Sequence, residues 1–450
     1  MRGSGAYYDW FPKARAASAR RWRRSANRSA KPASVFNLDV TVRSRVAPGF
    51  RLALLAILSL AALSASPPQA AAIPGGAGQS PPPGSGSGDS PFDRQGMWIW
   101  YVDRTEGGNP ARIAATAKRS GIGTLYIKSG DAGNYWGQFN RTLVRRLHAA
   151  GLDVCAWQFV YGDSPIAEAK VAAAAVRRGA DCFVIDAEGQ YEGKYAAADR
   201  YIRVLRARIG PDHPLALASF PYVDYHPSFP YSVFMGPGGA TFNQPQMYWK
   251  AIGTSVREVY EHTYLYNRLW KHPIYPIGQT YQRPARRQIL SFRRFAESYG
   301  GFQPSWWAWH ETSRASWRAL GAKLAGPVFG YRPIVSHPVL RRRSKGDLVV
   351  WAQMHLRAAV RPRLPVTGLF GARTRSAVRE FQSARGIRAD GVIGQATWRA
   401  LLKSEPVRPF WGGRLGRRAG AGASRAVAPS RPRSASLPAL GYEIDPGPAP

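Results

Sequence analysis

The stretch Gly368-Leu-Phe-Gly-Ala-Arg-Thr-Arg-Ser-Ala-Val378 returns 23 residues later as Gly391-Val-Ile-Gly-Gln-Ala-Thr-Trp-Arg-Ala-Leu401. In each copy a turn bounded by two glycines leads into a helix start, and the threonine offers an oxygen suited to the N-cap. The apolar residues of both copies recur at spacings that face a shared core. The repeat therefore predicts two short helices of one small helical module.

A third helix is expected upstream, where Gly346-Asp347 precedes an apolar run, and Phe381-Gln382 closes the helix between the two copies. Together these motifs resemble the peptidoglycan-binding domain type 1, a small three-helix module, over residues 338–402. The alternative is a module of this shape that binds another ligand. The residues that carry the resemblance are Gly346, Asp347, Gln353, Leu356, Gly368, Phe370, Gly371, Thr374, Ala377, Val378, Phe381, Gln382, Gly386, Asp390, Gly391, Gly394, Thr397, Trp398 and Leu401.

The length and the charge of the chain limit its class. Its 450 residues suffice for two or three domains with a large core, and its formal net charge is +36. Such a charge favours polyanions, including nucleic acid, anionic lipid and a wall rich in carboxylates and phosphates. We expect no nucleic-acid partner, because the charge is spread along the chain and no nucleic-acid-binding motif accompanies it.

The first 72 residues have the pattern of a basic leader and a signal peptide. An apolar run, Leu52–Ala65, follows arginines and ends before a small-residue stretch that closes at Ala72. The run is shorter than the ~20 apolar residues of a membrane span. We expect secretion with cleavage near Ala72; an uncleaved anchor is the alternative and the sole expected link to a membrane. A true translation start at Val42 or Val46 is a further hypothesis.

The composition then separates four further segments. Residues 73–91 are rich in Gly, Pro and Ser and predict a flexible linker, and residues 403–450 predict a disordered basic tail. The segment 92–320 holds a domain with alternating strands and helices. Its two cysteines, Cys155 and Cys182, are expected to be buried free thiols, with one bridge between neighbouring strands as the alternative.

Short apolar runs alternate with amphipathic stretches across residues 92–320. Eight strands in this alternation predict an α/β fold, a (β/α)8 TIM-type barrel followed by the three-helix module, with a doubly wound open sheet as the alternative. The expected strands are Met97–Val102, Thr124–Lys128, Asp153–Phe159, Cys182–Asp186, Leu215–Ser219, Pro245–Tyr248, Ile274–Ile277 and Ser305–Trp309. The expected helices include Ile113–Ser120, Thr142–Ala150, Pro165–Arg178 and Tyr195–Ile209, several of them ended by a glycine.

A carboxylate pair closes the fourth expected strand, Cys182-Phe-Val-Ile-Asp-Ala-Glu188. Asp186 and Glu188 are two residues apart, so both side chains point to the same face of the strand. Two carboxylates that are buried together raise the pKa of one of them, which suits a glycosidase that needs one acid protonated and one ionised. The alternative is a structural pair neutralised by Lys128 or Arg283.

This strand end resembles two families of retaining barrel glycosidases, the barrel-type lysozymes and the chitinase type. The resemblance implies Glu188 as general acid and Asp186 as the assisting carboxylate. It implies Asp181 at the more distant acidic position of the chitinase motif, whereas Val184 occupies the nearer one. The lysozyme-type acid on the first strand is missing here; Asp103 follows that strand instead.

The segment Gln244-Pro-Gln246-Met-Tyr248 resembles a strand end of the same barrels, where the tyrosine holds a substrate N-acetyl group. The resemblance gives Tyr248 a catalytic positioning role, with Gln246 in the substrate site. Barrel packing is the alternative for Tyr248. Further residues expected to bind substrate lie on strands or at strand ends, where aromatic rings stack on sugars and amides bond hydroxyls. They are Trp98, Trp100, Gln158, Gln279, Trp307 and Trp309.

These observations predict a secreted, cell-wall-associated glycoside hydrolase of lysozyme or muramidase type. It would cut a peptidoglycan-type N-acetylated glycan while the module at 338–402 holds it on the wall. The alternative is a non-catalytic wall-binding protein with an inactive barrel. We expect no cofactor and no metal, since the eight histidines do not cluster at ligand spacing. The sequence does not determine the oligomeric state.

Overall fold

The computed structural model describes residues 90–411. The expected leader at 1–72, nearly all of the linker at 73–91 and most of the tail at 403–450 lie outside the described residues. Within 90–411, no helix combines the length and the apolar character that crossing a membrane requires.

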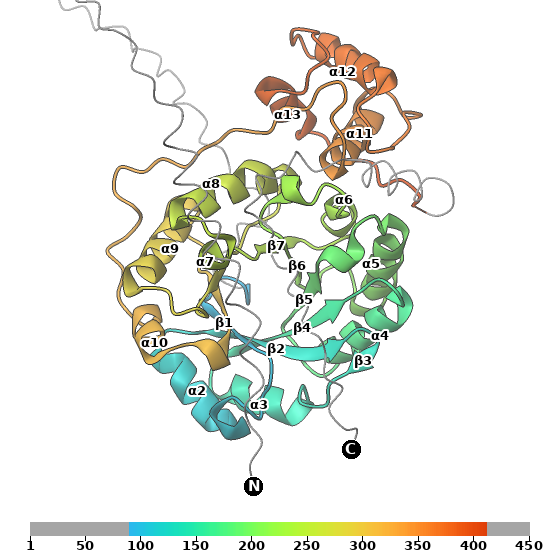
Figure 1. The fold of residues 1–450 in the computed structure, drawn as a ribbon. Helices are drawn as coiled ribbons and strands as arrows, with labels where there is room; N and C mark the ends of the chain where they lie inside the picture. The colour runs from blue at the N-terminus through green and yellow to red at the C-terminus, as the bar shows by residue number, and fades with distance from the viewer. Residues whose placement is uncertain (1–89, 412–450) are drawn as a thin grey trace, which may run out of the picture. The chain divides into compact units, whose positions relative to one another are not determined.

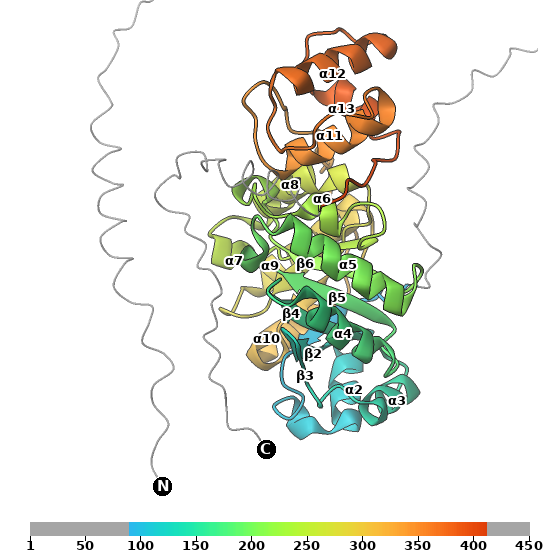
Figure 2. The same cartoon turned by 90° about the vertical axis from the view of Figure 1, so that its right-hand side faces the viewer.

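Eight parallel strands form a nearly closed barrel with helices around it (Figures 1 and 2). The order around the sheet is β7-β6-β5-β4-β2-β1-β9-β8, and two isolated parallel bridges, Asn243 to Ile274 and Gln246 to Ile277, join its two ends. The barrel prediction is confirmed. The strands are β1 (Gly96–Ile99), β2 (Thr124–Asp131), β4 (Asp153–Val160), β5 (Cys182–Ala187), β6 (Leu215–Ser219), β7 (Phe242–Pro245), β8 (Ile277–Gln279) and β9 (Ser305–Trp307), with a short β3 (Asn134–Tyr135) pairing with β2.

The helices follow the strands along the chain, as a barrel requires. Glycines in the left-handed region end the helices before β4 and β5: Gly151 has φ 79° and Gly179 has φ 99°. The barrel helices are α2 (Pro110–Arg119), α3 (Arg141–Ala149), α4 (Pro165–Val176), α5 (Tyr195–Ile209), α6 (Tyr231–Phe234), α7 (Trp249–Ile252), α8 (Val256–Asn267), α9 (Arg286–Tyr299) and α10 (Arg314–Leu320). Five short 3-10 helices complete the segment: Glu106–Gly108, Gly189–Tyr191, Val223–Tyr225, Arg268–Trp270 and Trp309–Glu311.

Two expected strands are shifted along the chain, and β1 and β9 end at Ile99 and Trp307, before their predicted ends at Val102 and Trp309. The strand expected at Pro245–Tyr248 ends at Pro245, because the chain turns there and the Tyr248 N–H bonds the Gln246 carbonyl. The strand expected at Ile274–Ile277 begins only at Ile277, because Pro276 has no N–H to donate to a ladder.

The strand residues sort into two layers with a period of two. One layer fills the barrel interior and contains Trp98, Tyr126, Trp157, Val184 and Trp307. The other packs outward against the helices and contains neighbours of these residues, such as Ile99, Phe183 and Trp306. The interior is therefore mainly aromatic and apolar, and any charge within it is costly to bury.

Cys155 and Cys182 form a disulfide inside the barrel, so the expectation of free thiols is wrong. The two residues pair directly in the register of β4 and β5, which brings both side chains to the same point of the interior. That register joins residues 27 positions apart, and the sequence alone does not show it.

The disulfide predicts a measurable stability term. Cross-linking a loop of 27 residues stabilises a fold by about 3 to 4 kcal/mol in the chain-entropy treatment. Reduction, or the double substitution Cys155→Ala and Cys182→Ala, should lower the melting temperature. Thiol titration of the denatured chain should find free thiols only after reduction, and free thiols before reduction would contradict the bridge.

The C-terminal module consists of α11 (Asp347–Ala359), α12 (Ala372–Ala384) and α13 (Gln395–Leu401), drawn in orange in Figure 1. Each repeat is held by one buried glutamine. Gln353 accepts from the Gly368 N–H and donates to the Thr374 hydroxyl at 2.9 Å. Gln382 makes the same two bonds with Gly391 and Thr397. The pseudo-repeat is thus a repeated glutamine clamp.

We had expected the threonines of the repeat to be N-caps, and this expectation is wrong. The N-cap residues are Gly371 and Gly394, and neither makes a side-chain cap bond. Thr374 and Thr397 lie three residues further on and are buried, where their hydroxyls receive the glutamine amides.

Asp347 fixes the start of α11 against α6 of the barrel. Its carboxylate accepts from the Ser232 N–H at 2.8 Å and from the Ser232 hydroxyl at 2.5 Å. Gly346 before it has φ 104° and lies against Pro227, so that a side chain at this position would clash. Burial raises the pKa of Asp347 to about 7, although the bonds from Ser232 oppose the rise.

Residues 403–411 pack as well, although we had expected the whole of 403–450 to be disordered. Arg408 bonds Asp199 of α5 at 2.8 Å, and Trp411 is fully buried beside Tyr195. The buried Trp411, the Arg408–Asp199 ion pair and the Lys271–Glu405 ion pair explain why this short part of a basic segment packs on the rest of the chain.

The Asp347 contact predicts that truncation costs more than neutralisation. Asp347→Ala leaves the buried Ser232 N–H and hydroxyl without an acceptor, at about 1 to 3 kcal/mol, and should lower the melting temperature. Asp347→Asn keeps an oxygen and serves as the control. Because the folded pKa of Asp347 is raised, its contribution to stability falls as pH rises from about 4 to about 7. Equal melting temperatures for both variants and wild type would contradict this role.

Candidate active site

The carboxylates of Asp186 and Glu188 lie together at the C-terminal end of β5. Asp186 points into the barrel and is 4% exposed, and Glu188 follows the strand and is half-buried. Both line one small cavity. The two-residue spacing on the strand therefore placed them on one face, as the sequence indicated.

Gln246, which follows β7, joins the two carboxylates. Its side-chain Nε2 donates to Asp186 Oδ1 at 3.0 Å and to Glu188 Oε1 at 3.0 Å. The backbone of Gln246 is held in place after the turn at Pro245, because its N–H donates to the Ser219 carbonyl at the end of β6. One amide thus satisfies one oxygen of each acid across the barrel.

The environment raises the pKa of both acids. Burial raises the pKa of Asp186 well above its usual range, and the nearby Glu188 charge adds to the rise while Lys128 opposes it. Burial raises the pKa of Glu188 to about 7, and the Gln246 amide opposes that rise. The pair therefore holds at least one proton near neutral pH, which is the state that a carboxylic acid needs to donate one.

Lys128 supplies a positive charge beneath this pair, but it does not neutralise the pair directly. Its Nζ forms an ion pair with Asp131 at 2.6 Å and lies 4.0 Å from the centre of the Trp100 ring. Rings of Trp136 and Trp157 lie within 5.0 Å of the same nitrogen. The aromatic cage and Asp131 thus compensate the burial of the ammonium group.

The cavity at the site brings together most of the residues that the sequence singled out. Its volume is about 30 Å³, room for one or two water molecules. A sugar ring therefore needs the partly exposed rings at the rim to move. The lining residues are Trp98, Trp100, Phe159, Asp186, Glu188, Gln246, Tyr248, Ile277 and Trp307.

Four expected substrate residues lie elsewhere. Asp181 precedes β5 at the other end of the barrel, where it bonds His148 and the Val154 N–H. Gln158 points outward and donates to the carbonyls of Ala132 and Glu168. The other two serve loop and helix packing: Gln279 accepts from the backbone N–H groups of Lys250 and Ala251, and Trp309 packs on Trp317. None of the four lines the cavity.

Sequence reasoning missed two residues that line the cavity and one that supports the loops near it. Phe159 and Ile277 line the cavity from β4 and β8, and both were hidden because their strand bounds or facing were unknown. Buried Glu168 of α4 accepts from the Gly162 N–H and from the Tyr191 hydroxyl, which fixes the loops after β4 and β5. An acid in an otherwise alanine-rich apolar helix was the signal available for it.

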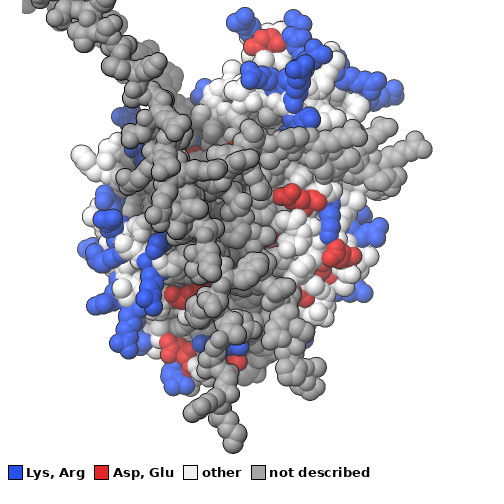
Figure 3. All heavy atoms as spheres, in the orientation of Figure 1, with Lys and Arg blue, Asp and Glu red and all other residues white. Residues whose placement is uncertain are grey.

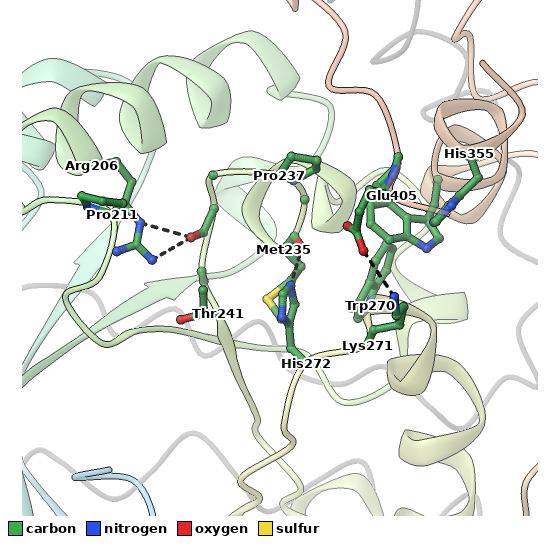
Figure 4. A pocket seen from close by; sticks show the side chains of 16 residues that line it. Arg206, Pro211, Met235, Pro237, Thr241, Trp270, Lys271, His272, His355 and Glu405 are labelled. Carbon is green, nitrogen blue, oxygen red and sulfur yellow. Dashed lines mark hydrogen bonds and ion pairs between the residues drawn. The ribbon is translucent and has the colours of Figure 1, made fainter. Parts of the chain in front are cut away.

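A larger hollow of about 530 Å³ lies between α5, the loop around Gly236–Gly239 and α11 (Figure 4). Its charged side chains are already engaged, with Arg206 on the Gly239 carbonyl and Lys271 on Glu405. It contains no acid pair, so its size gives it no claim to the chemistry. The smaller cavity with Asp186 and Glu188 is the better candidate.

Comparison with known families and curated proteins identifies the C-terminal module. The family model described as "Putative peptidoglycan binding domain" matches residues 345–401, which confirms the resemblance found for the helical repeat. Over 79 residues the chain is 35% identical to a protein of Kitasatospora aureofaciens described as "Uncharacterized protein in bpoA1 3'region". The match covers 17% of this chain and 67% of that relative, so the two proteins belong to one family. The description of the relative states no activity.

Solved structures resemble part of this chain, with TM-scores below 0.5. An endo-beta-1,4-mannanase from Thermotoga petrophila matches 49% of this chain and 68% of its own, with a TM-score of 0.37 and 9% identity. A family 25 glycosyl hydrolase from Bacillus anthracis matches 34% of this chain and 70% of its own, with a TM-score of 0.25 and 12% identity. An endo-1,4-beta-mannanase from Rhizomucor miehei matches 48% of this chain and 86% of its own, with a TM-score of 0.38 and 7% identity. At these scores the likenesses carry no argument about function.

The shared amide predicts how the acids titrate. Gln246→Leu removes the donor that stabilises the charged carboxylates, so the pKa of Glu188 should rise above about 7. The measurement is an NMR titration of side-chain carboxyl groups, with Asn109→Ala, a change at the N-cap of α2, as the control. An unchanged or lowered pKa of Glu188 in the Leu variant would contradict the bridging geometry.

Proposed function

We propose that this protein is a secreted, cell-wall-associated glycoside hydrolase that cuts a peptidoglycan-type N-acetylated glycan. The single observation that carries the proposal is the pair Asp186 and Glu188 with raised pKa values, bridged by Gln246 inside an aromatic barrel. The peptidoglycan-binding module in the same chain supports the wall as the substrate.

In the proposed mechanism Glu188 is the general acid. Its raised pKa keeps it protonated up to neutral pH, and its half-buried position at the rim lets it reach the glycosidic oxygen of a bound glycan. The proton passes to the leaving sugar as the bond to the anomeric carbon breaks. Glu188 then becomes the carboxylate that accepts a proton from the attacking water.

Asp186 and Tyr248 would act on the substrate rather than on the leaving group. With an N-acetyl sugar bound, the acetamide oxygen can attack the anomeric carbon in place of an enzyme nucleophile. Asp186 would orient the acetamide N–H and Tyr248, which lines the same cavity, would position the carbonyl. The pKa of Asp186 is raised by burial and by the Glu188 charge, and Lys128 opposes that rise, which favours the ionised form that this step uses.

The rings of Trp98, Trp100 and Trp307 support a sugar as the substrate. They line the cavity and contact each other at centroid distances of 5.6 Å between Trp98 and Trp307 and between Trp100 and Trp307. Trp100, the partly exposed member, is the one placed to stack on a sugar face that enters from the rim.

A second candidate function is a non-catalytic wall-binding protein. The cavity volume of about 30 Å³ favours it, because a sugar ring does not fit without movement of the rim. The first strand also offers no carboxylate to the cavity, and Asp103 after it is exposed. Under this alternative the carboxylates have no role in turnover.

The test is the release of reducing ends from purified peptidoglycan by the full chain and by Glu188→Gln. We expect the substitution to reduce the rate by about 10² to 10⁴, as for the loss of a general acid, while sedimentation with the wall stays unchanged. Asp103→Asn, which neutralises an exposed acid outside the cavity, is the matched control and should retain the full rate.

The pH dependence separates this role from a loss of folding. For the wild type, kcat/KM should fall about tenfold for each pH unit above about 7, because Glu188 loses the proton that it donates. Equal release by wild type and Glu188→Gln would refute the assignment of the acid. Absence of release from either, with wall binding retained, would favour the non-catalytic alternative.

A further inference from the structure

A basic hollow lies on the surface of the wall-binding module, away from the carboxylate cavity. It has a volume of about 280 Å³ and is lined by Arg342, Ala372, Arg375, Ser376 and Arg379. Four of these residues belong to α12 and occupy positions i, i+3, i+4 and i+7, counted from Ala372, so they form one face of that helix. Arginine side chains make up most of the wall of the hollow.

A tight turn brings Arg342 to this face. The Ser344 N–H bonds the Arg341 carbonyl at 2.8 Å, and the Ser344 hydroxyl accepts from the Arg341 N–H at 3.0 Å. Arg343 adopts φ 77° and bonds the Phe370 carbonyl, just before α12 begins. The backbone thus fixes the turn beside the start of α12, which sets the place of the third guanidinium group.

The acidic residues of the module do not neutralise the hollow. Residues 338–402 contain 13 Lys and Arg against 3 Asp and Glu. Asp347 is buried against Ser232, Glu380 pairs with Arg361, and Asp390 accepts from Gln382 and from the Val392 N–H. Within residues 90–411, neither Arg342 nor Arg375 nor Arg379 has an ion-pair partner.

This arrangement carries an electrostatic cost that an anion would relieve. Arg375 and Arg379 are four residues apart on one helix face, a spacing at which like charges repel. Their stems also pack on Gly391, and Arg379 donates to the Ala389 carbonyl at 2.9 Å, so the side chains are held near each other. In Figure 3 Lys and Arg side chains cover much of the visible surface of the module.

We propose that this hollow binds the phosphate groups of an anionic, phosphodiester-bearing cell-wall polymer. Guanidinium groups match phosphate oxygens with paired N–H donors, and three of them around one hollow exceed the charge of a single carboxylate. The hollow has no aromatic ring among its lining residues, so neither a sugar face nor a nucleobase finds a stacking surface there. The inference rests on the proposed wall location, but it does not depend on hydrolysis.

The test uses the full chain and a soluble poly(glycerol phosphate) as the probe. The double variant Arg342→Gln and Arg375→Gln should weaken binding at least tenfold at low salt. The dependence of log affinity on log salt should also become less steep: the magnitude of its negative slope should fall by about two, one for each lost phosphate contact. The matched control, Arg363→Gln with Arg399→Gln, removes the same charge from exposed sites outside the hollow and should weaken binding less than twofold.

Further arms distinguish the outcomes. Walls stripped of phosphate polymers should bind the double variant and the wild type equally, which separates this site from glycan binding by the module. Equal losses in the double variant and the control would overturn the site and indicate only diffuse attraction. The wall polymer would be overturned as the partner if duplex DNA bound more tightly than the probe and if this binding depended on Arg342 to the same degree. Loss of reducing-end release in either variant is not expected, so failure of the hydrolase proposal leaves this test intact.

Discussion

The structure depends on the burial of two carboxylates at the open end of an aromatic barrel. An isolated charge in such surroundings is expensive, and the chain reduces the cost by sharing one Gln246 amide between Asp186 and Glu188 and by keeping Lys128 within reach of Asp186. Lys128 itself is stable there because Asp131 and three indole rings surround it. Each of these polar groups is therefore stabilised by a neighbouring polar group, because the aromatic packing keeps most water out of the interior.

The part of the site that the sequence predicted is the part that depends on local geometry. Asp186 and Glu188 share a face because strand side chains alternate, whatever the neighbouring strands do. Asp181 lies away from the cavity because it precedes β5, and the direction of the strand places it at the opposite end of the barrel. Trp309 lies outside the cavity because β9 ends at Trp307 and a 3-10 helix begins at Trp309. For Trp309 the difference came from a strand boundary, which apolar runs locate only to within a few residues. For Asp181 the strand start at Cys182 was predicted correctly, and the direction of the strand accounts for its position.

Long-range register lay beyond the sequence for a different reason. The pairing of Cys155 with Cys182 and of Ser232 with Asp347 depends on how distant segments align, and nothing within either segment encodes its partner. The module shows the same limit. Its helices and their glycine-bounded turns were predictable from the repeat, whereas the buried hydroxyls of Thr374 and Thr397 are explained only by the clamps of Gln353 and Gln382.

The contacts of the module bear on how it assists the barrel. A module on a free linker raises the local concentration of substrate in proportion to the reach of that linker. Here Asp347 bonds Ser232, and the Trp351 indole donates to the Leu269 carbonyl at 2.9 Å, so part of that freedom is lost. The gain then depends on the spacing of binding groups along the wall polymer rather than on linker length. Under the proposed function, a docked module would also compensate a narrow cavity, because binding energy from the wall would offset the cost of moving the rim rings when a sugar enters.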